Sequence, residues 1–162
     1  METQSPSRVS IRPMAEPDIR PAKPDDLPGI LALYRQLNPG DPILDLDAAE
    51  AAWSVLLSSG LTTPFVAEIE GLLVSSCTLA IVPNLSRGAR PYGVIENVVT
   101  HTDHRRTGLG RAVLQAALHK AWEANCYKVL LATGSQREST LRFYEGAGFQ
   151  RGGKTYFEIR RS

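Results

Sequence analysis

The residues best suited to chemistry lie between positions 101 and 114, where glycines and arginines surround the start of an expected helix. The run before them, residues 93–100, is rich in β-branched side chains and predicts a buried strand. Gly108 and Gly110 let backbone N–H groups approach a ligand closely, and the helix dipole favours an anion at that end. Positive charge is added by Arg105, Arg106 and Arg111. This turn therefore predicts a bound phosphate or pyrophosphate.

The glycine spacing distinguishes this turn from two common phosphate loops. A Walker P-loop needs a Gly-Lys-Ser/Thr sequence, which this segment lacks. The dinucleotide fingerprint Gly-x-Gly-x-x-Gly fits at Gly108 and Gly110, but Val113 occupies its third glycine position. What remains is Arg-x-x-Gly-x-Gly, from Arg105 to Gly110. By itself this pattern also fits an ordinary glycine-capped turn, and an unrelated nucleotide-binding domain stays open as an alternative.

The surrounding sequence predicts the elements that hold this turn. Strands are expected at 19–21, 65–70, 72–82, 93–100, 127–132 and 154–160, and helices at 27–37, 47–58, 107–124 and 137–146. This order indicates an α/β (α+β) fold, a single domain with a mixed, twisted sheet of six to seven strands flanked by about four helices. Residues 1–18 are expected to be a flexible extension of a domain spanning 19–162. Residues 11–18 nearly repeat 19–26, and the first copy could be a strand of its own.

A second pattern, LRFYEGAGF at residues 141–149, follows one helix and one strand after the turn. Together the two patterns resemble the GCN5-related N-acetyltransferase (GNAT) family, whose acyl-coenzyme A loop is followed by a Phe-Tyr-Glu-x-x-Gly-Phe element. The resemblance covers roughly residues 95–149. Residues 95–99 and 126–130 resemble the glucosamine-phosphate acetyltransferase branch, although Asn97 and Ala132 stand where that branch typically has acidic residues.

The resemblance implies an N-acetyltransferase that moves an acetyl group from acetyl-CoA to a primary amine of a small molecule by direct attack. Acetyl-CoA is then the cosubstrate, and no metal is expected. By matching position, the pantetheine arm pairs with the main chain of Val98, Val99 and Thr100. The pyrophosphate lies on the amides of Arg105, Arg106, Thr107, Gly108, Leu109, Gly110 and Arg111. Arg137 or Ser139 lies near where family members often place an Asn that touches the cofactor, so this chain departs from the pattern there.

Transfer to an amine needs a neutral nucleophile, a stabilised oxyanion and a proton for the leaving thiolate. The N–H of Val98 is the candidate oxyanion donor, at a bulged or splayed strand. Tyr144 is the candidate general acid, because a phenol is protonated at neutral pH. Glu96 is the candidate base, and strand alternation would place it on the face of Val98, with Asn97 on the other. The alternatives are a Tyr144 that only packs and a Glu96 paired with Arg or Lys. A non-catalytic acyl-CoA-binding sensor on the same fold is the competing function.

Composition limits the partners further. The 162 residues carry a net charge of +1, which argues against general nucleic-acid or membrane-surface binding. The chain has no expected secretion signal or membrane span, so a cytoplasmic location is expected. Cys77 and Cys126 form no metal or redox motif and are expected in the core, as are Trp53 and Trp122. Family members often form homodimers, and a homodimer is compatible with the sequence. Three acidic residues could attract a cationic amine or cap the second helix: Asp41, Asp45 and Asp47.

Overall fold

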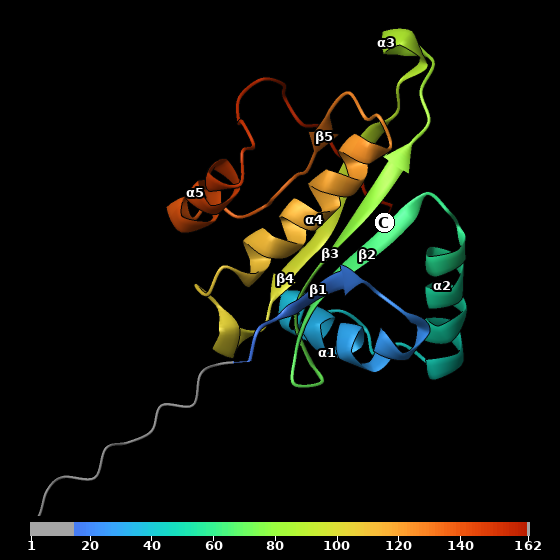
Figure 1. Cartoon of the computed structure of the whole chain (residues 1–162), viewed down its shortest axis with the longest axis vertical. Helices are drawn as coiled ribbons and strands as arrows, with labels where there is room; N and C mark the ends of the chain where they lie inside the picture. The colour runs from blue at the N-terminus through green and yellow to red at the C-terminus, as the bar shows by residue number, and fades with distance from the viewer. Residues whose placement is uncertain (1–14, 162) are drawn as a thin grey trace, which may run out of the picture.

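The structure is a computed structural model that describes residues 15–161. One five-stranded sheet runs in the order β1-β2-β3-β4-β5, antiparallel except for the parallel pair β4–β5 (Figure 1). The strands are β1 (Asp18–Pro21), β2 (Thr62–Ile69), β3 (Leu72–Val82), β4 (Tyr92–Thr100) and β5 (Val129–Leu130). The helices are α1 (Leu27–Leu37), α2 (Leu46–Ser58), α3 (Ser86–Ala89), α4 (Leu109–Glu123) and α5 (Glu138–Gly146), with short 3-10 turns at Pro24–Asp26 and Thr102–His104.

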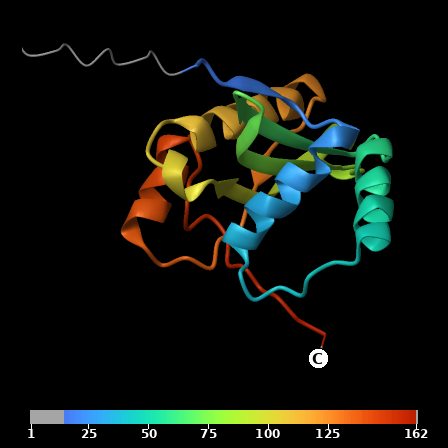
Figure 2. The same ribbon diagram turned by 90° about the horizontal axis from the view of Figure 1, so that it is seen from below.

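The helices cover the two faces of the sheet separately (Figure 2). The long helix α4 packs on one face, where Val113 and Ala117 join Cys77 and Ile95 of the strands in one buried cluster. On the other face a second cluster joins α1 and α2 to the sheet, from residues including Ile30, Leu33, Trp53, Val66 and Val99. Each of α1, α2 and α4 thus buries one apolar stripe against the strands, as the helical spacing of its sequence predicts.

A buried ion-pair network fixes the start of the domain. Arg20 of β1 donates to both carboxylate oxygens of Asp26, at 2.7 and 3.0 Å, and to Glu68 of β2 at 2.5 Å. Asp26 is only 6% exposed and also accepts the N–H of Lys23 at 2.8 Å. Burial alone would raise the pKa of Asp26, but the hydrogen bonds from Arg20 and Lys23 hold it below its ordinary value. This network ties β1 to the turn that starts α1.

The sequence-based map of elements is confirmed except near the C-terminus and between β3 and β4. The sheet has five strands rather than six to seven, because residues 154–160 have no strand partner among the described residues and the expected strand 127–132 is reduced to Val129–Leu130. The short helix α3 lies in a segment expected to be a loop. Residues 1–14, which hold most of the expected extension and part of the near-repeat, lie outside the described residues, and the domain boundary stays a prediction.

Three of the four expected core residues are buried. Cys77 and Cys126 are buried free thiols, and Trp53 is buried between α2 and the sheet. Trp122 is the exception, because its side chain is 52% exposed and lines a groove at the sheet edge beside β5. None of the helices within residues 15–161 has the length and apolar character needed to cross a membrane.

Candidate active site

The centre of the site is an irregularity in β4. Ser76 pairs with Val99 and Thr78 pairs with Glu96, so the single residue Cys77 of β3 opposes two residues of β4. This is a β-bulge at Asn97 and Val98, and Asn97 takes a left-handed backbone conformation with φ of 54°. On its other side β4 pairs with β5 only at Gly93 and Val94. From residue 95 to 100 that edge of β4 has no strand beside it within the described chain, so its peptide groups lack a strand partner and can bind an extended ligand. The Thr100 carbonyl already accepts the Nε–H of Arg105 at 3.3 Å.

The bulge changes which side chains share a face, and it corrects the expected alternation. Ile95 and Val98 both pack with the α4 cluster, whereas Val99 belongs to the α1 cluster. Glu96 lies directly opposite Thr78, whose hydroxyl is 3.4 Å from Tyr34 of α1, so Glu96 faces the α1 side. Glu96 and Val98 therefore lie on opposite faces, because the extra residue shifts the strand by one position.

Tyr34 is a site residue that sequence reasoning missed. The helical spacing of α1 predicted only that Tyr34 lies on its apolar face. Its hydroxyl also reaches Thr78, and Asn97 beside the bulge. Burial raises the pKa of Tyr34, and these hydrogen bonds oppose the rise. The contact to Thr78 spans 44 positions in the sequence, so no local pattern could have found it. The hydrogen bond to Asn97 places that side chain on the α1 side with Glu96, whereas strand alternation predicts opposite faces for these two residues.

The glycine turn has the expected geometry for an anion. Gly108 is the N-cap of α4 with φ of 85°, and Arg106 is also left-handed with φ of 61°. The first intrahelical bond runs from Ala112 N–H to the Gly108 carbonyl, so the N–H groups of the three residues before Ala112 have no helical acceptor. All of Arg105, Arg106, Thr107 and Arg111 are solvent-accessible at this end. The helix dipole and these N–H groups together favour a bound anion.

Close packing holds the turn against the end of β4. A Cβ at Gly110 would lie 3.0 Å from the Thr100 hydroxyl and 3.2 Å from the ring of Phe143, so no larger residue fits without a shift. The Thr100 hydroxyl is itself 2.9 Å from that of buried Ser75. From the other direction, the side-chain oxygen of Gln36 accepts the N–H of Thr102 at 2.9 Å. The free edge of β4 and the start of α4 are therefore one continuous surface.

Tyr144 lies in α5 and reaches the site from the α4 side of the sheet. Its ring packs against the α4 cluster and against Phe143 and Phe149, with ring centroids 5.0 and 6.3 Å apart. Burial raises the pKa of Tyr144, and the nearby Cys77 thiol and Glu96 carboxylate raise it further. The phenol thus stays protonated at neutral pH. Glu96 is exposed and forms no ion pair with any described residue, so the expected alternative of a structural salt bridge is not seen.

The remaining expected residues lie at the edge of the site. Arg137 is the N-cap residue of α5 and Ser139 lies in its first turn, both with exposed side chains. Asp45 caps α2 by accepting the N–H of Ala48 at 3.3 Å, which favours the capping role for this one acid. Asp41 lies with Tyr34 and Arg35 in the lining of a pocket formed by α1 and the loop that follows it, and Asp47 lies in the first turn of α2.

Comparison with known proteins decides the family. The family model described as "Acetyltransferase (GNAT) family" matches residues 29–149. The chain belongs to the GNAT acetyltransferases. It is 32% identical over 133 residues to a glucosamine 6-phosphate N-acetyltransferase of Trypanosoma brucei brucei, covering 82% of this chain and 88% of that protein.

Solved structures agree with this GNAT assignment. A putative acetyltransferase from Agrobacterium tumefaciens str. C58 is 48% identical with a TM-score of 0.85, covering 89% of this chain and 99% of that one. The glucosamine-6-phosphate N-acetyltransferase of Arabidopsis thaliana, at 22% identity and a TM-score of 0.79, covers 89% and 98% and shares the fold. The protein is an N-acetyltransferase, and acetyl transfer to an amine is its reaction class. The expected GNAT resemblance is confirmed.

Proposed function

We propose that this N-acetyltransferase takes its acetyl group from acetyl-CoA and transfers it to the primary amine of a small molecule. The observation that carries the proposal is the continuous surface of the free β4 edge, the bulge and the start of α4. An extended thioester arm fits the free edge, and the pyrophosphate fits the N–H groups between Arg105 and Arg111. The peptide groups along this surface are therefore suited to bind acetyl-CoA.

The residues around the bulge suit direct attack of the amine on the thioester. The amine nitrogen forms a bond to the acetyl carbon, and the carbon–sulfur bond breaks. The N–H of Val98, at the bulge, stabilises the negative charge that develops on the acetyl oxygen. Tyr144 donates its phenolic proton to the leaving thiolate, and Glu96 accepts the proton lost by the amine, directly or through a water. Glu96 on the α1 side and Tyr144 on the α4 side then act at opposite sides of one strand edge.

The first acceptor class to test is an amino-sugar phosphate. The Trypanosoma brucei brucei relative and a Schizosaccharomyces pombe relative that is 30% identical over 96 residues are both named glucosamine 6-phosphate N-acetyltransferases. Asn97 replaces an acidic residue expected for that branch and is held next to Tyr34 and Thr78 on the acceptor side. A neutral amide there attracts a protonated amine less strongly than a carboxylate does, so other primary amines belong in the same screen.

The test measures both cofactor binding and turnover. Acetyl-CoA at about 100 times its dissociation constant should stabilise the fold by about 2.7 kcal/mol, and ATP or NAD should not. With an accepted amine, Tyr144→Phe should lower kcat by roughly 10²- to 10⁴-fold while leaving the thermal midpoint unchanged, because the ring still packs. Tyr127→Phe is the matched control, because it removes the hydroxyl of a tyrosine that lies just before β5, and it should retain full activity. Stabilisation by ATP rather than acetyl-CoA would refute the cofactor, and a wild-type rate in Tyr144→Phe would refute the acid.

A further inference from the structure

A tyrosine hydroxyl from α1 reaches β4 at the point where regular strand pairing stops. The Tyr34 hydroxyl lies 3.4 Å from that of Thr78 and also forms a hydrogen bond with the Asn97 side chain. Thr78 pairs with Glu96, which is the last regular pair before the bulge. A phenol can donate one hydrogen bond and accept others, so this hydroxyl can bind to side chains of both strands at once. Tyr34 thus connects α1 to the bulge.

The conformation of the bulge decides where the Val98 N–H points. This N–H belongs to the planar peptide group between Asn97 and Val98, so its direction follows from the backbone angles of Asn97. With φ of 54°, Asn97 lies in the left-handed region, which asparagine adopts more readily than most residues but less readily than glycine. The Asn97 side chain is exposed, so packing alone does not fix it. A hydrogen bond from α1 can therefore select this conformation.

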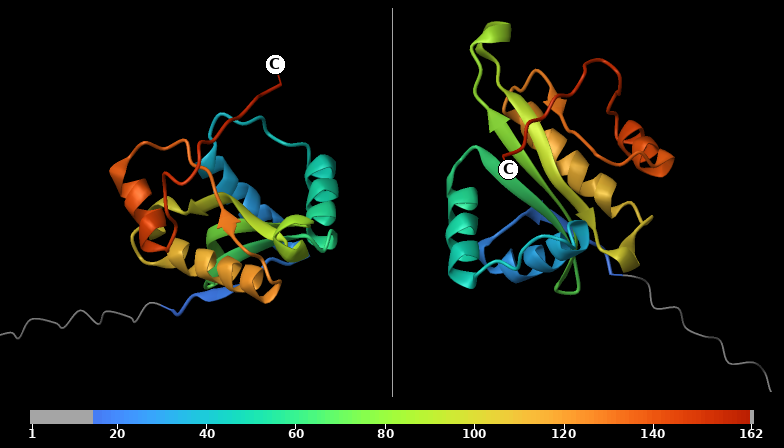
Figure 3. Two further views of the ribbon diagram at one scale, coloured as in Figure 1. Left: turned by 90° about the horizontal axis from the view of Figure 1, so that it is seen from above. Right: turned by 180° about the vertical axis from the view of Figure 1, so that it is seen from behind.

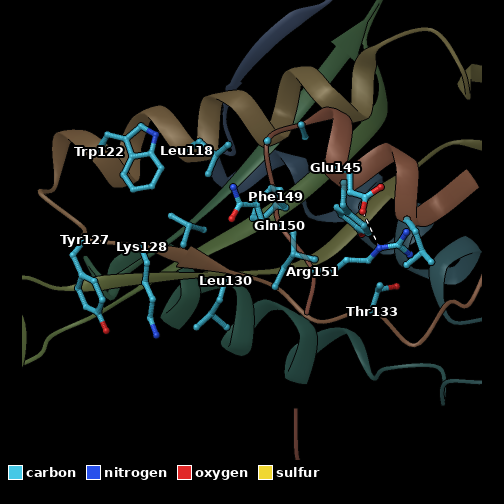
Figure 4. A pocket seen from close by; sticks show the side chains of 16 residues that line it. Leu118, Trp122, Tyr127, Lys128, Leu130, Thr133, Glu145, Phe149, Gln150 and Arg151 are labelled. Atoms are coloured by element: carbon cyan, nitrogen blue, oxygen red, sulfur yellow. Dashed lines mark ion pairs between the residues drawn. The ribbon is translucent and has the colours of Figure 1, made fainter. Parts of the chain in front are cut away.

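Tyr34 approaches the bulge from the face of the sheet that α1 covers. Here α1 lies across β3 and β4, with Leu33 and Val99 in one buried cluster (Figure 3). Tyr144, by contrast, lies in the lining of an open groove of about 860 Å³ between α4, β5 and α5, which Figure 4 shows. Beyond Val94, no strand of the described chain supports the outer edge of β4. Contacts from α1 are therefore well placed to hold the bulge.

We propose that Tyr34 is a positioning residue for acetyl transfer. Its hydroxyl, beside Thr78, keeps the Asn97 side chain on the α1 side and so maintains the left-handed turn that aims the Val98 N–H at the acetyl oxygen. The inference rests on the proposed function, because it concerns the group that stabilises the negative charge of the transition state. In this role Tyr34 touches none of the reacting atoms and acts through Asn97 and the peptide group that follows it.

Ser76 provides a matched control on the same face of β3. It lies two residues before Thr78 and pairs with Val99, which is the first regular pair after the bulge. Its side chain is fully buried, and its hydroxyl has no hydrogen-bond partner within the described residues. Ser76→Ala therefore removes a buried hydroxyl close to the bulge without breaking a hydrogen bond. A role specific to the Tyr34 hydroxyl predicts that Ser76→Ala keeps wild-type activity.

Steady-state kinetics with an accepted amine is the first test. Tyr34→Phe keeps the ring packed against the α1 cluster and removes only the hydroxyl. We expect kcat to fall by roughly 10- to 10²-fold, less than after removal of an oxyanion donor, because the Val98 N–H is misdirected rather than absent. The KM for acetyl-CoA should stay unchanged, since the free edge of β4 and the start of α4 are not altered. A wild-type kcat in Tyr34→Phe would overturn the proposal.

A double-mutant cycle shows whether the effect passes through Asn97. Asn97→Gly removes the side chain, while glycine still adopts the left-handed backbone readily. In this background Tyr34→Phe should cause no further loss of kcat, because the hydrogen bond that it removes no longer exists. Losses that simply multiply would show that the Tyr34 hydroxyl acts by another route and would contradict the positioning role.

Isotope-edited infrared spectroscopy measures the hydrogen bond to the acetyl oxygen without turnover. Acetyl-CoA labelled with carbon-13 at its carbonyl is bound to each protein with no amine present. A hydrogen bond to the carbonyl oxygen lowers its stretching frequency, so the wild type and Ser76→Ala should show the same downshift and Tyr34→Phe a smaller one. An equal downshift in Tyr34→Phe would refute the positioning role and leave the proposed function intact. A wild type that binds no acetyl-CoA would instead refute the proposed function itself, and this inference with it.

Discussion

Gly110 offers the sharpest test of how the glycine turn is held against the sheet. In Gly110→Ala the new methyl group meets the Thr100 hydroxyl at 3.0 Å and Phe143 at 3.2 Å. Thr100 cannot rotate away freely, because its hydroxyl is paired with Ser75. We therefore expect a destabilised fold, although alanine is the better residue for a helix.

The magnitude follows from opposing contributions. Replacing glycine by alanine in a helix gains up to about 1 kcal/mol, and burying one methyl group gains about 0.8 kcal/mol. Overpacking costs about 1–3 kcal/mol, and the lost Thr100–Ser75 hydrogen bond costs about 0.5–1.5 kcal/mol. The sum is a loss of about 1 kcal/mol, at the centre of a range from about zero to about 3 kcal/mol, and this central value lowers the melting temperature by roughly 2–4 °C.

A double-mutant cycle in urea isolates the contact. Thr100→Ala removes the atom that the new methyl group meets, so Gly110→Ala and Thr100→Ala should couple by at least about 0.5 kcal/mol. The control cycle uses Gly108→Ala, where the added Cβ has no neighbour within 4 Å and the cost comes from the φ of 85°. That pair should be additive within about 0.5 kcal/mol. Additivity in the Gly110 cycle, or a more stable Gly110→Ala protein, would refute the role given to this contact.

Two further expectations concern charge and protons. Arg20→Met should cost roughly 3–5 kcal/mol in urea unfolding, because it leaves Asp26 buried without its partner, whereas exposed Arg35→Met should cost little. Since the pKa of Asp26 is lowered by folding, its contribution is present above pH of about 4 and is lost as the pH falls through the folded pKa; Arg20→Met should lose this acid dependence. Because the pKa of Tyr144 is raised, its phenol should stay protonated and kcat should decline only above a pH of about 10. A decline of kcat near neutral pH that persists in Tyr144→Phe would assign that titration to another group.

The parts of the fold that the sequence could predict are those set by local patterns. The helical spacing of α4, the Glu70–Gly71 turn of the β2–β3 hairpin and the glycine spacing of residues 105–110 each depend on residues close together in the chain. Their chemistry is local too, because backbone conformation and helix-end charge arise within a few residues. The amino-acid sequence alone is therefore enough to predict the phosphate turn and the family resemblance.

The face of the sheet on which Glu96 lies could not be predicted from the sequence, because of the bulge. An irregular strand was expected at Val98, but the expected alternation was carried straight across it. The single extra residue in β4 reverses the alternation after it, and Asn97 in a run of β-branched residues does not indicate a left-handed backbone. The environment of Tyr34 could not be predicted from the sequence for a related reason. Its contacts to Thr78 and Asn97 arise only when α1 packs across two strands that are distant in sequence.

The expected strand at 154–160 and the expected burial of Trp122 both differ from the structure. The alternation of residues 154–160 is typical of a strand, and the helical spacing of Trp122 is typical of a buried side chain. Neither pattern states which molecule supplies the partner, because hydrophobic periodicity reports that a surface is to be covered and carries no information on what covers it.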